Sequence, residues 1–250
     1  MLNHLIITLM NEKIKQIVVL VVTWLGIIAP FPAAVASFRP GGAADTFGRE
    51  PLVTPAPWAF LIWAPIYLGL LALAVYQALP AQERDPRMMA LRPWLAASGV
   101  LNALWLSAVA TDALWTPVLI IFALLAAALA LRRSFGIGVA QGGLVRWLGV
   151  AVSIYAGWLT LATIVNTSSA LLLSGWEGGA TFWAVVMLLV GTAIGMAVRA
   201  GWRDPVYGGV FVWTLLAIAA AQWGNPLVVI TAALLALITA ASLVPAFSRK

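Results

Sequence analysis

Long apolar runs alternate with short polar or charged segments along the whole chain. A transmembrane helix needs about 20 apolar residues to cross about 30 Å of hydrocarbon. The runs that meet this requirement span residues 16–37, 57–79, 92–111, 114–131, 145–168, 180–198, 206–223 and 226–246. The pattern therefore predicts an all-α integral membrane protein with about eight transmembrane helices. So few residues separate the third run from the fourth, and the seventh from the eighth, that each pair is expected to form a tight helical hairpin.

Composition supports a membrane protein and argues against a soluble one. Charged residues make up 9% of the chain and hydrophobic residues 63%, with a mean hydropathy of +1.02. A soluble domain carries about 25% charged residues, because water must wet its surface. The net charge of +6 would suggest nucleic-acid binding in a soluble protein. Here the basic residues lie at the ends of apolar runs, so we expect membrane lipid, and no nucleic acid, as the partner.

The distribution of basic residues predicts the orientation. If the N-terminus is cytoplasmic, twelve of the 14 lysines and arginines fall in inner segments, and only Arg39 and Arg49 fall outside. Inner segments of membrane proteins carry such an excess of positive charge. The sequence therefore predicts a multi-pass protein of the cell (inner) membrane with both termini in the cytoplasm.

The N-terminal segment is expected to stay attached to the protein. Residues 1–15 precede the first apolar run and are predicted to form a cytoplasmic tail. The apolar run after Lys15 continues to about Phe38 without a small-residue cleavage site at signal-peptide length. We therefore expect a first transmembrane span instead of a signal peptide. Met10 could equally be the true start of translation.

Few residues could support metal binding or catalysis. The chain has no cysteine and a single histidine, His4, and its eight carboxylates are scattered. This excludes disulfides and leaves no usual zinc or iron site. No ionisable residue lies near the middle of an apolar run, which argues against a proton-coupled pump. Asp112 and Glu177 are expected to be solvated caps. We therefore expect neither an enzyme nor a required cofactor.

Three segments carry more than hydrophobicity, and they lie on the second, third and fifth runs. These are TPAPWAFLIWAPIYLGLLALAVYQ, LNALW and YAGWLTLATIVN, which begin at Thr54, Leu101 and Tyr155. In this order they resemble the tryptophan-rich sensory protein/translocator protein family. Its second helix opens with P-x-W…W-x-x-x-Y, its third holds L-N-x-x-W, and its fifth holds W-x-x-[FY]-A-T-x-L-N. The spacing from Trp58 to Trp63 is one residue short of the family pattern.

The resemblance implies a five-helix bundle over residues 16–170, followed by an additional three-helix membrane segment over residues 171–250. It also implies a bound lipophile, such as a tetrapyrrole, a sterol or a carotenoid, and it is compatible with a homodimer. The first outer loop, about residues 39–56, would then form a lid over an outward-facing pocket or merely connect two helices. The ligand-binding residues that it implies are Trp58, Trp63, Tyr67, Asn102, Trp105, Tyr155, Trp158, Ala162 and Asn166.

Helical spacing places these side chains on shared faces, but it does not decide their role. Residues three and four apart share a face, which groups Trp63 with Tyr67, Asn102 with Trp105, and Tyr155 with Trp158, Ala162 and Asn166. Indole and phenol rings beside an asparagine suit a flat apolar molecule with a few polar edges. The same rings could pack against one another, and both asparagines could form interhelical hydrogen bonds.

Other tryptophans are expected to anchor the helices. The chain has 13 tryptophans, and indole rings gather at the two interfaces between membrane and water. The tryptophans near predicted span ends or in loops are Trp24, Trp94, Trp115, Trp147, Trp176, Trp202 and Trp223.

The leading functional hypothesis is a membrane protein that binds, senses or moves a lipophilic ligand. A membrane transporter or permease subunit is an alternative, although the absence of midplane charges and of a nucleotide-binding motif argues against it. A structural subunit of a larger membrane complex is another alternative. Tryptophan-assisted chemistry on a bound tetrapyrrole is the one enzymatic exception.

Overall fold

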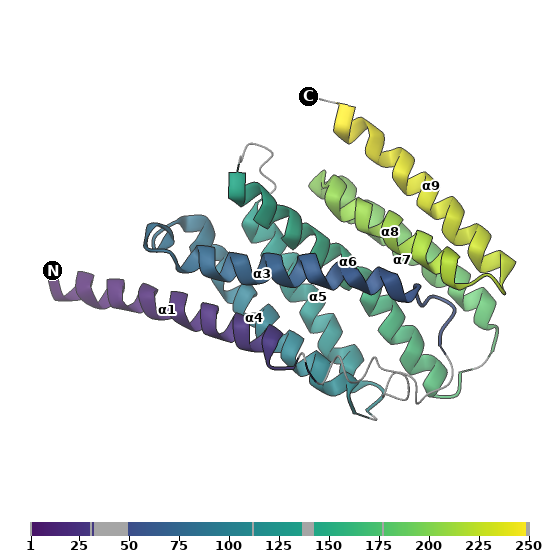
Figure 1. Cartoon of the computed structure of the whole chain (residues 1–250), viewed down its shortest axis with the longest axis horizontal. Coiled ribbons are helices and arrows are strands. Elements are labelled where there is room, and N and C mark those ends of the chain that lie inside the picture. The colour runs from purple at the N-terminus through teal and green to yellow at the C-terminus, as the bar shows by residue number, and fades with distance from the viewer. Residues whose placement is uncertain are drawn as a thin grey trace.

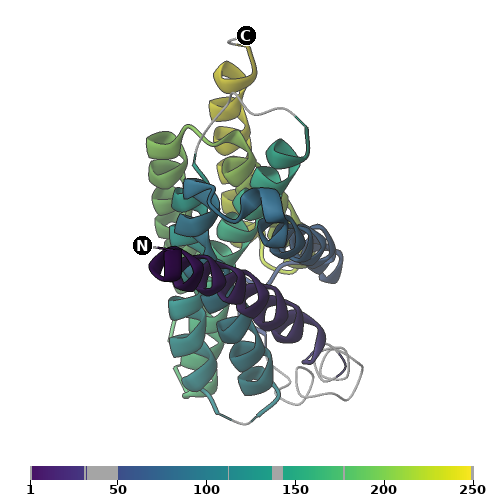
Figure 2. The ribbon, with the colours of Figure 1, turned by 90° about the vertical axis from the view of Figure 1, so that its left-hand side faces the viewer.

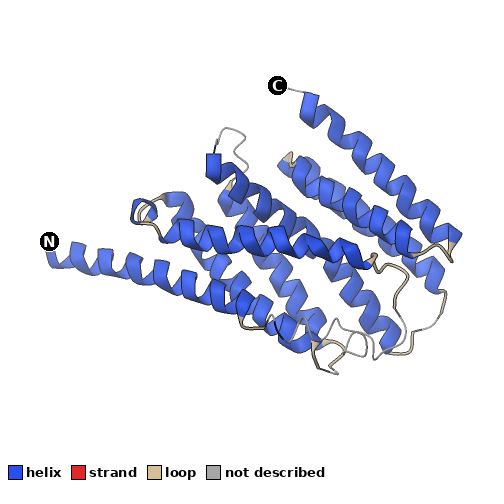
Figure 3. Ribbon diagram, viewed as in Figure 1, coloured by secondary structure: helices blue, strands red, loops and turns tan. Residues whose placement is uncertain are grey.

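The computed structural model of the protein describes residues 2–30, 32, 50–111, 113–136, 143–176 and 178–248, with side chains from Glu12 to Val244 within those ranges. Every regular element in this part of the chain is helical (Figure 3). Two short 3-10 helices, η1 (Pro57–Ile62) and η2 (Pro80–Gln82), precede α3 and α4. The α-helices are α1 (Leu2–Ile28), α3 (Trp63–Ala78), α4 (Pro86–Val109), α5 (Thr116–Phe135), α6 (Gly143–Leu173), α7 (Ala180–Trp202), α8 (Pro205–Ala221) and α9 (Pro226–Ser248).

Each predicted span overlaps one of these helices, so the predicted all-α membrane fold is confirmed. α8 is apolar but only 17 residues long. The first helix begins at Leu2, earlier than predicted, because no glycine or proline interrupts the sequence before Gly26. The helical stretches that are long and apolar enough to cross a membrane are Pro57–Ala78, Thr116–Phe135, Gly143–Leu173, Ala180–Trp202 and Pro226–Val244.

α4 and α8 both begin at the proline of an Arg-Asp-Pro sequence. Asp85 caps α4 and Asp204 caps α8. The Oδ1 atom of each aspartate accepts hydrogen bonds from the backbone N–H groups two and three residues later, at distances between 2.8 and 3.1 Å. Pro86 and Pro205 occupy the first helical position, where a missing N–H costs nothing. The same local chemistry thus starts both helices.

The first five α-helices form a closed ring. α1 packs against α3 and α4, α4 against α5, α5 against α6, and α6 against α3. α8 packs on α6, α9 packs on α8, and α7 contacts all three of α6, α8 and α9. α1, α3 and α4 lie toward the left of Figure 1 and α7, α8 and α9 toward the right, and α1 crosses the face turned to the viewer in Figure 2. The hairpins expected between α4 and α5 and between α8 and α9 are confirmed by extensive packing.

Glycines bring two pairs of helices into backbone contact. A Cβ atom added at Gly26 of α1 would overlap the backbone carbonyl of Gly99 on α4. At Gly157 of α6, an added Cβ would lie 3.1 Å from the Cβ of Val210 and 3.2 Å from the carbonyl oxygen of Tyr207 on α8. Small residues permit such close approach between transmembrane helices. These contacts hold α1 in the ring and seat α8 on α6.

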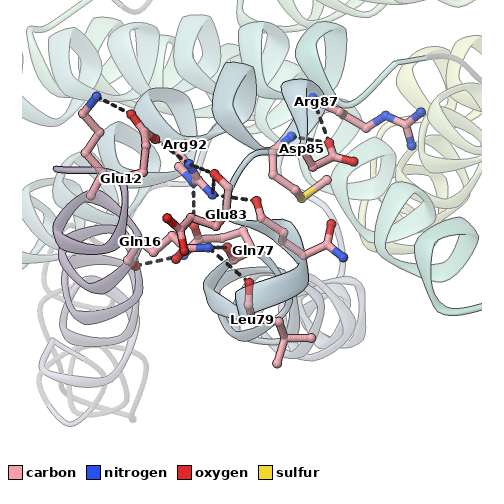
Figure 4. Close-up of polar contacts among 11 residues, drawn as sticks. Glu12, Gln16, Gln77, Leu79, Glu83, Asp85, Arg87 and Arg92 are labelled. Atoms are coloured by element: carbon pink, nitrogen blue, oxygen red, sulfur yellow. Dashed lines mark hydrogen bonds and ion pairs between the residues drawn. The ribbon is translucent and has the colours of Figure 1, made fainter. Parts of the chain in front are cut away.

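A polar network joins α1, α3 and α4 at one end of the ring (Figure 4). Arg92 is 3% exposed, donates from Nε to Oε1 of Gln77 at 3.1 Å, and pairs with Oε2 of Glu12 at 2.9 Å. Its Nη2 donates to the carbonyl oxygen of Gln82 at 2.8 Å. Gln16 donates from Nε2 to the carbonyl oxygen of Gln77 at 2.7 Å, and Gln77 returns the bond at 3.0 Å. The buried guanidinium is therefore neutralised and hydrogen-bonded, as burial of a charge requires.

A second buried arginine joins α5 to α6 and α8. Arg132 donates from Nε and Nη2 to Oδ2 of Asp204, at 2.8 and 2.6 Å, and the hydroxyl of Ser153 donates to the same oxygen at 2.7 Å. Arg132 is 6% exposed and Asp204 is 3% exposed. Because α5 and α6 belong to the ring, this cluster attaches the second group of helices to the first.

Most of the tryptophans expected as anchors lie at the surface. Six of the seven are between 40% and 77% exposed, and the exception is Trp202. Trp202 is half-buried, with its ring 6.0 Å from the guanidinium carbon of Arg132 and edge-on to Tyr207 at 5.8 Å between centroids. Trp202 thus packs against the buried ion pair, and its role as an interfacial anchor stays a prediction.

Candidate functional site

Trp63 of α3 is the centre of an aromatic cluster inside the ring. Its indole stacks on Tyr67, with centroids 5.0 Å apart and planes at 24°. It also contacts Trp105 of α4 at 6.0 Å and meets the edge of Trp158 of α6 at 6.1 Å. Phe60 of η1 meets the edge of Trp158 at 5.5 Å. Stacked and edge-to-face rings at these separations stabilise one another, so three helices meet through aromatic contacts.

Asn102 connects three helices through hydrogen bonds. Its Oδ1 accepts a hydrogen bond from the hydroxyl of Tyr67 at 3.3 Å, and its Nδ2 donates to the carbonyl oxygen of Gly26 at 3.0 Å. Asn102 is 2% exposed. The amide therefore fixes the phenol of α3 and the backbone of α1 against α4. The interhelical hydrogen bonding that the sequence left open for this asparagine is present.

Asn166 makes a second link, between α6 and α4. The indole Nε1 of Trp105 donates to Oδ1 of Asn166 at 3.2 Å, and Nδ2 of Asn166 donates to the carbonyl oxygen of Ala162 at 2.9 Å. The asparagine thus both accepts from a neighbouring helix and donates to its own. Eight of the nine predicted residues lie on the three helices joined by these contacts: Trp63, Tyr67, Asn102, Trp105, Tyr155, Trp158, Ala162 and Asn166.

Two buried polar atoms at this site have no hydrogen-bond partner within the described residues, the indole Nε1 of Trp158 and the hydroxyl of Thr23. The buried hydroxyls of Tyr155 and Ser98 lie close to each other. All four side chains are at most 3% exposed. An unsatisfied buried polar group costs about 1–3 kcal/mol, and native structures contain few of them. These groups are therefore where a bound molecule would gain the most from a hydrogen bond.

The sequence analysis did not predict Ser98 or Thr23 as site residues. A signal for Ser98 was available, because it lies four residues before Asn102 and so shares its helix face. Thr23 lies where α1 and α4 touch, since a Cβ added at Gly99 would be 2.8 Å from its Cα. That contact depends on the pairing of two helices, which no local spacing reveals.

A family comparison bears directly on this arrangement. A family model described as TSPO-like protein matches residues 10–244. The chain belongs to the TSPO-like family. The match runs from α1 into α9, so it takes in α7 and α8 together with the five-helix ring. Comparisons with curated proteins and with solved structures gave no match.

Family membership confirms the resemblance carried by the three motifs. Together with helices that are long and apolar enough to cross a bilayer, it makes this TSPO-like protein a membrane protein. The lid expected over residues 39–56 falls mostly outside the described residues. Its described end lies along α8, where the N–H of Ala56 donates to the carbonyl oxygen of Ala217 at 3.0 Å.

Trp58 lies apart from the other predicted site residues. It is 41% exposed and meets the edge of Trp213 on α8, with centroids 4.8 Å apart. The indole Nε1 of Trp213 donates to the carbonyl oxygen of Ala59 at 3.2 Å. Trp58 belongs to a 3-10 helix, which has three residues per turn. The sequence predicted one continuous α-helix through both residues. Its spacing therefore does not give the side on which Trp58 lies relative to Trp63.

The TSPO-like protein also has an open groove outside the aromatic cluster. The groove has a volume of about 490 Å³ and lies between α3 and α8, with α6 and α9 contributing to its walls. None of the nine predicted residues lines it. Residues that do include Ile62, Pro65, Ile154, Gly209 and Trp213. The indole of Trp63 thus contacts those of Trp105 and Trp158 in the ring, while this space lies beside them.

Proposed function

We propose that this TSPO-like protein binds a lipophilic molecule inside the five-helix ring and that the molecule carries at least one hydrogen-bond acceptor. The observation that carries the proposal is the buried, unpartnered indole N–H of Trp158 on α6. An indole N–H can only donate, so its partner must be an acceptor. The carboxylate or keto group of a tetrapyrrole, the hydroxyl oxygen of a sterol and an oxygenated carotenoid all meet this requirement.

The surrounding rings support a flat apolar body for this ligand. Trp63 is only partly buried, although it contacts three other rings. Tyr67 and Phe60 are partly buried too, so these three rings have surface left that a ligand can contact. In the proposed complex the ligand takes up contacts with Trp63, Tyr67 and Trp105 while its acceptor lies at Trp158 and Tyr155.

This proposal describes a binding protein and not an enzyme. Sensing and movement of the ligand remain part of the proposed role, and a transporter or a subunit of a larger complex remain the alternatives. We further propose that the end of the ring that holds Arg92 and Arg132 faces the cytoplasm of a cell with the protein in its inner membrane. Arg92 lies near the start of α4 and Arg132 near the end of α5. This end of the ring is therefore positively charged, and positive charge is in excess on the cytoplasmic side of membrane proteins.

Porphyrin quenching of tryptophan fluorescence tests the proposal. Protoporphyrin titrated into the purified protein in detergent should quench in a saturable way. Tyr155→Phe and Trp158→Phe each remove one donor and keep an aromatic ring, so each should weaken binding about tenfold, the equivalent of one hydrogen bond. Trp147→Phe is the matched control, because Trp147 is 71% exposed. Non-saturating quenching, or equal affinity in all four proteins, would overturn the proposal.

A further inference from the structure

The groove between α3 and α8 exists because both helices pack on α6 and leave a gap above it. α6 contacts both neighbours, and Ile154 of α6 forms part of the groove wall. On α8, Gly209 contributes no side chain, and a Cβ added there would meet nothing within 4 Å. Leu61 at the rim is 70% exposed, although it is fully apolar. In a membrane protein, such a rim faces the hydrocarbon of the bilayer.

The groove offers its occupant no hydrogen bond from a side chain. Its lining side chains are aliphatic, proline or glycine apart from Trp213, and the N–H of Trp213 already donates to the carbonyl oxygen of Ala59. A molecule with polar edges would leave those edges unpaired here, which is unfavourable. A hydrocarbon chain has no such cost. The groove therefore suits the tail of a lipid and not the acceptor-bearing ligand proposed for the ring.

Positive charge lies at one end of the groove. The aliphatic part of the Arg199 side chain lies against Gly208 of α8. Its Nη2 donates to the carbonyl oxygen of Ser242, which precedes Leu243 in the groove wall. The Nε of Arg199 is buried without a partner among the described residues. Arg203 is exposed and lies two residues before Pro205, which also lines the groove.

Among the described residues, no free carboxylate offsets this charge at this end of α8. Asp204 is the acidic residue at this end of α8, and its two oxygens are taken by Arg132, by Ser153 and by two backbone N–H groups. The exposed Arg203 is thus available for an anion, and Arg199 places a second positive charge at the same end of the groove. A phosphate diester complements them, because arginine forms charge-assisted hydrogen bonds to phosphate oxygens.

We propose that the groove binds an anionic phospholipid, with one acyl chain along α8 and the phosphate at Arg199 and Arg203. The apolar lining selects the chain, and the adjacent arginines select a net negative headgroup over a zwitterionic one. This site is separate from the ring site and does not depend on it.

Native mass spectrometry of the full chain tests the proposal with phosphatidylglycerol and phosphatidylcholine of the same acyl composition. We expect phosphatidylglycerol to be retained about tenfold better. Gly209→Leu should abolish the preference by filling the groove, whereas Gly201→Leu on α7, where an added Cβ also meets nothing within 4 Å, should keep it. Equal retention of the two lipids by the wild type would overturn the proposal.

Arg203→Asn tests the headgroup contact separately. Asparagine removes the charge and tolerates the left-handed backbone conformation of Arg203, which has a φ of 51°. Arg84→Asn is the matched control, because Arg84 is also exposed and also precedes an Asp-Pro helix start. We expect Arg203→Asn to lower phosphatidylglycerol retention about tenfold and Arg84→Asn to leave it unchanged. Equal effects of the two variants would contradict the site. Porphyrin affinity should stay unchanged in Gly209→Leu, which distinguishes failure here from failure of the ring site.

Discussion

Arg132 on α5 and Asp204 at the start of α8 form a buried ion pair with a separation of 2.6 Å between Nη2 and Oδ2. The two residues are 72 positions apart in the chain. The other oxygen of Asp204 caps α8, so one carboxylate both starts that helix and attaches it to the ring. The position of α8, and with it one wall of the groove, depends on this residue.

The first prediction concerns Asp204→Asn. Asparagine keeps the helix cap but leaves the guanidinium of Arg132 buried without a counter-ion. Breaking a buried ion pair in this way costs about 3–5 kcal/mol, so the midpoint of thermal unfolding in detergent should fall strongly. Asp85→Asn is the control, because Asp85 caps α4 through the same two hydrogen bonds and forms no ion pair within the described residues. Equal loss of stability in both variants would show that the cap, and not the ion pair, stabilises the protein.

The second prediction concerns Gly26→Ala on α1. An added Cβ would overlap the backbone of Gly99, which cannot move aside as a side chain can. Separation of α1 from α4 should cost about 1–3 kcal/mol and also weaken the hydrogen bond from Asn102 to the Gly26 carbonyl. Gly224→Ala, where an added Cβ meets nothing within 4 Å, should be neutral. The free energy of unfolding can be measured in guanidinium. Equal values for the two variants would contradict the observed backbone contact.

The third prediction concerns Gln77→Leu in the network of Figure 4. The change removes the acceptor for the Nε of Arg92 and the donor to the carbonyl of Gln16, and both partners are buried. Leaving them unpaired should cost about 2 kcal/mol in the free energy of unfolding. Gln82→Leu is the comparison, because Gln82 contributes only its backbone carbonyl to Arg92. We expect its stability to change by less than about 0.5 kcal/mol.

Much of the fold could be predicted from hydrophobic pattern alone. Runs of apolar residues located every α-helix of the described residues, because the bilayer sets the length of a span. Helical spacing also brought Trp63 and Tyr67 onto one face, and it did the same for Asn102 and Trp105. These features are local, so a single sequence contains them. The start of α1 at Leu2 does not follow from the apolar run, because a helix can extend beyond the residues that cross the membrane.

The features that escaped prediction depend on which helices become neighbours. Nothing in the sequence around Asp204 indicates that Arg132 is its partner. Trp58 lies outside the aromatic cluster because it belongs to the 3-10 helix that precedes α3. The division after residue 170 remains a prediction, although the family match continues to residue 244. The groove beside the ring arises from the packing of α3 and α8 on α6, which no motif encodes.

The central claim is that a ligand accepts a hydrogen bond from the indole of Trp158. It can be measured directly on protein labelled with ¹⁵N-tryptophan, with the Nε1–H resonance of Trp158 assigned by its loss in Trp158→Phe. We predict that protoporphyrin shifts this resonance downfield in a saturable way and leaves that of the exposed Trp223 in place. A Trp158 resonance that stays unchanged at saturating porphyrin would contradict the account.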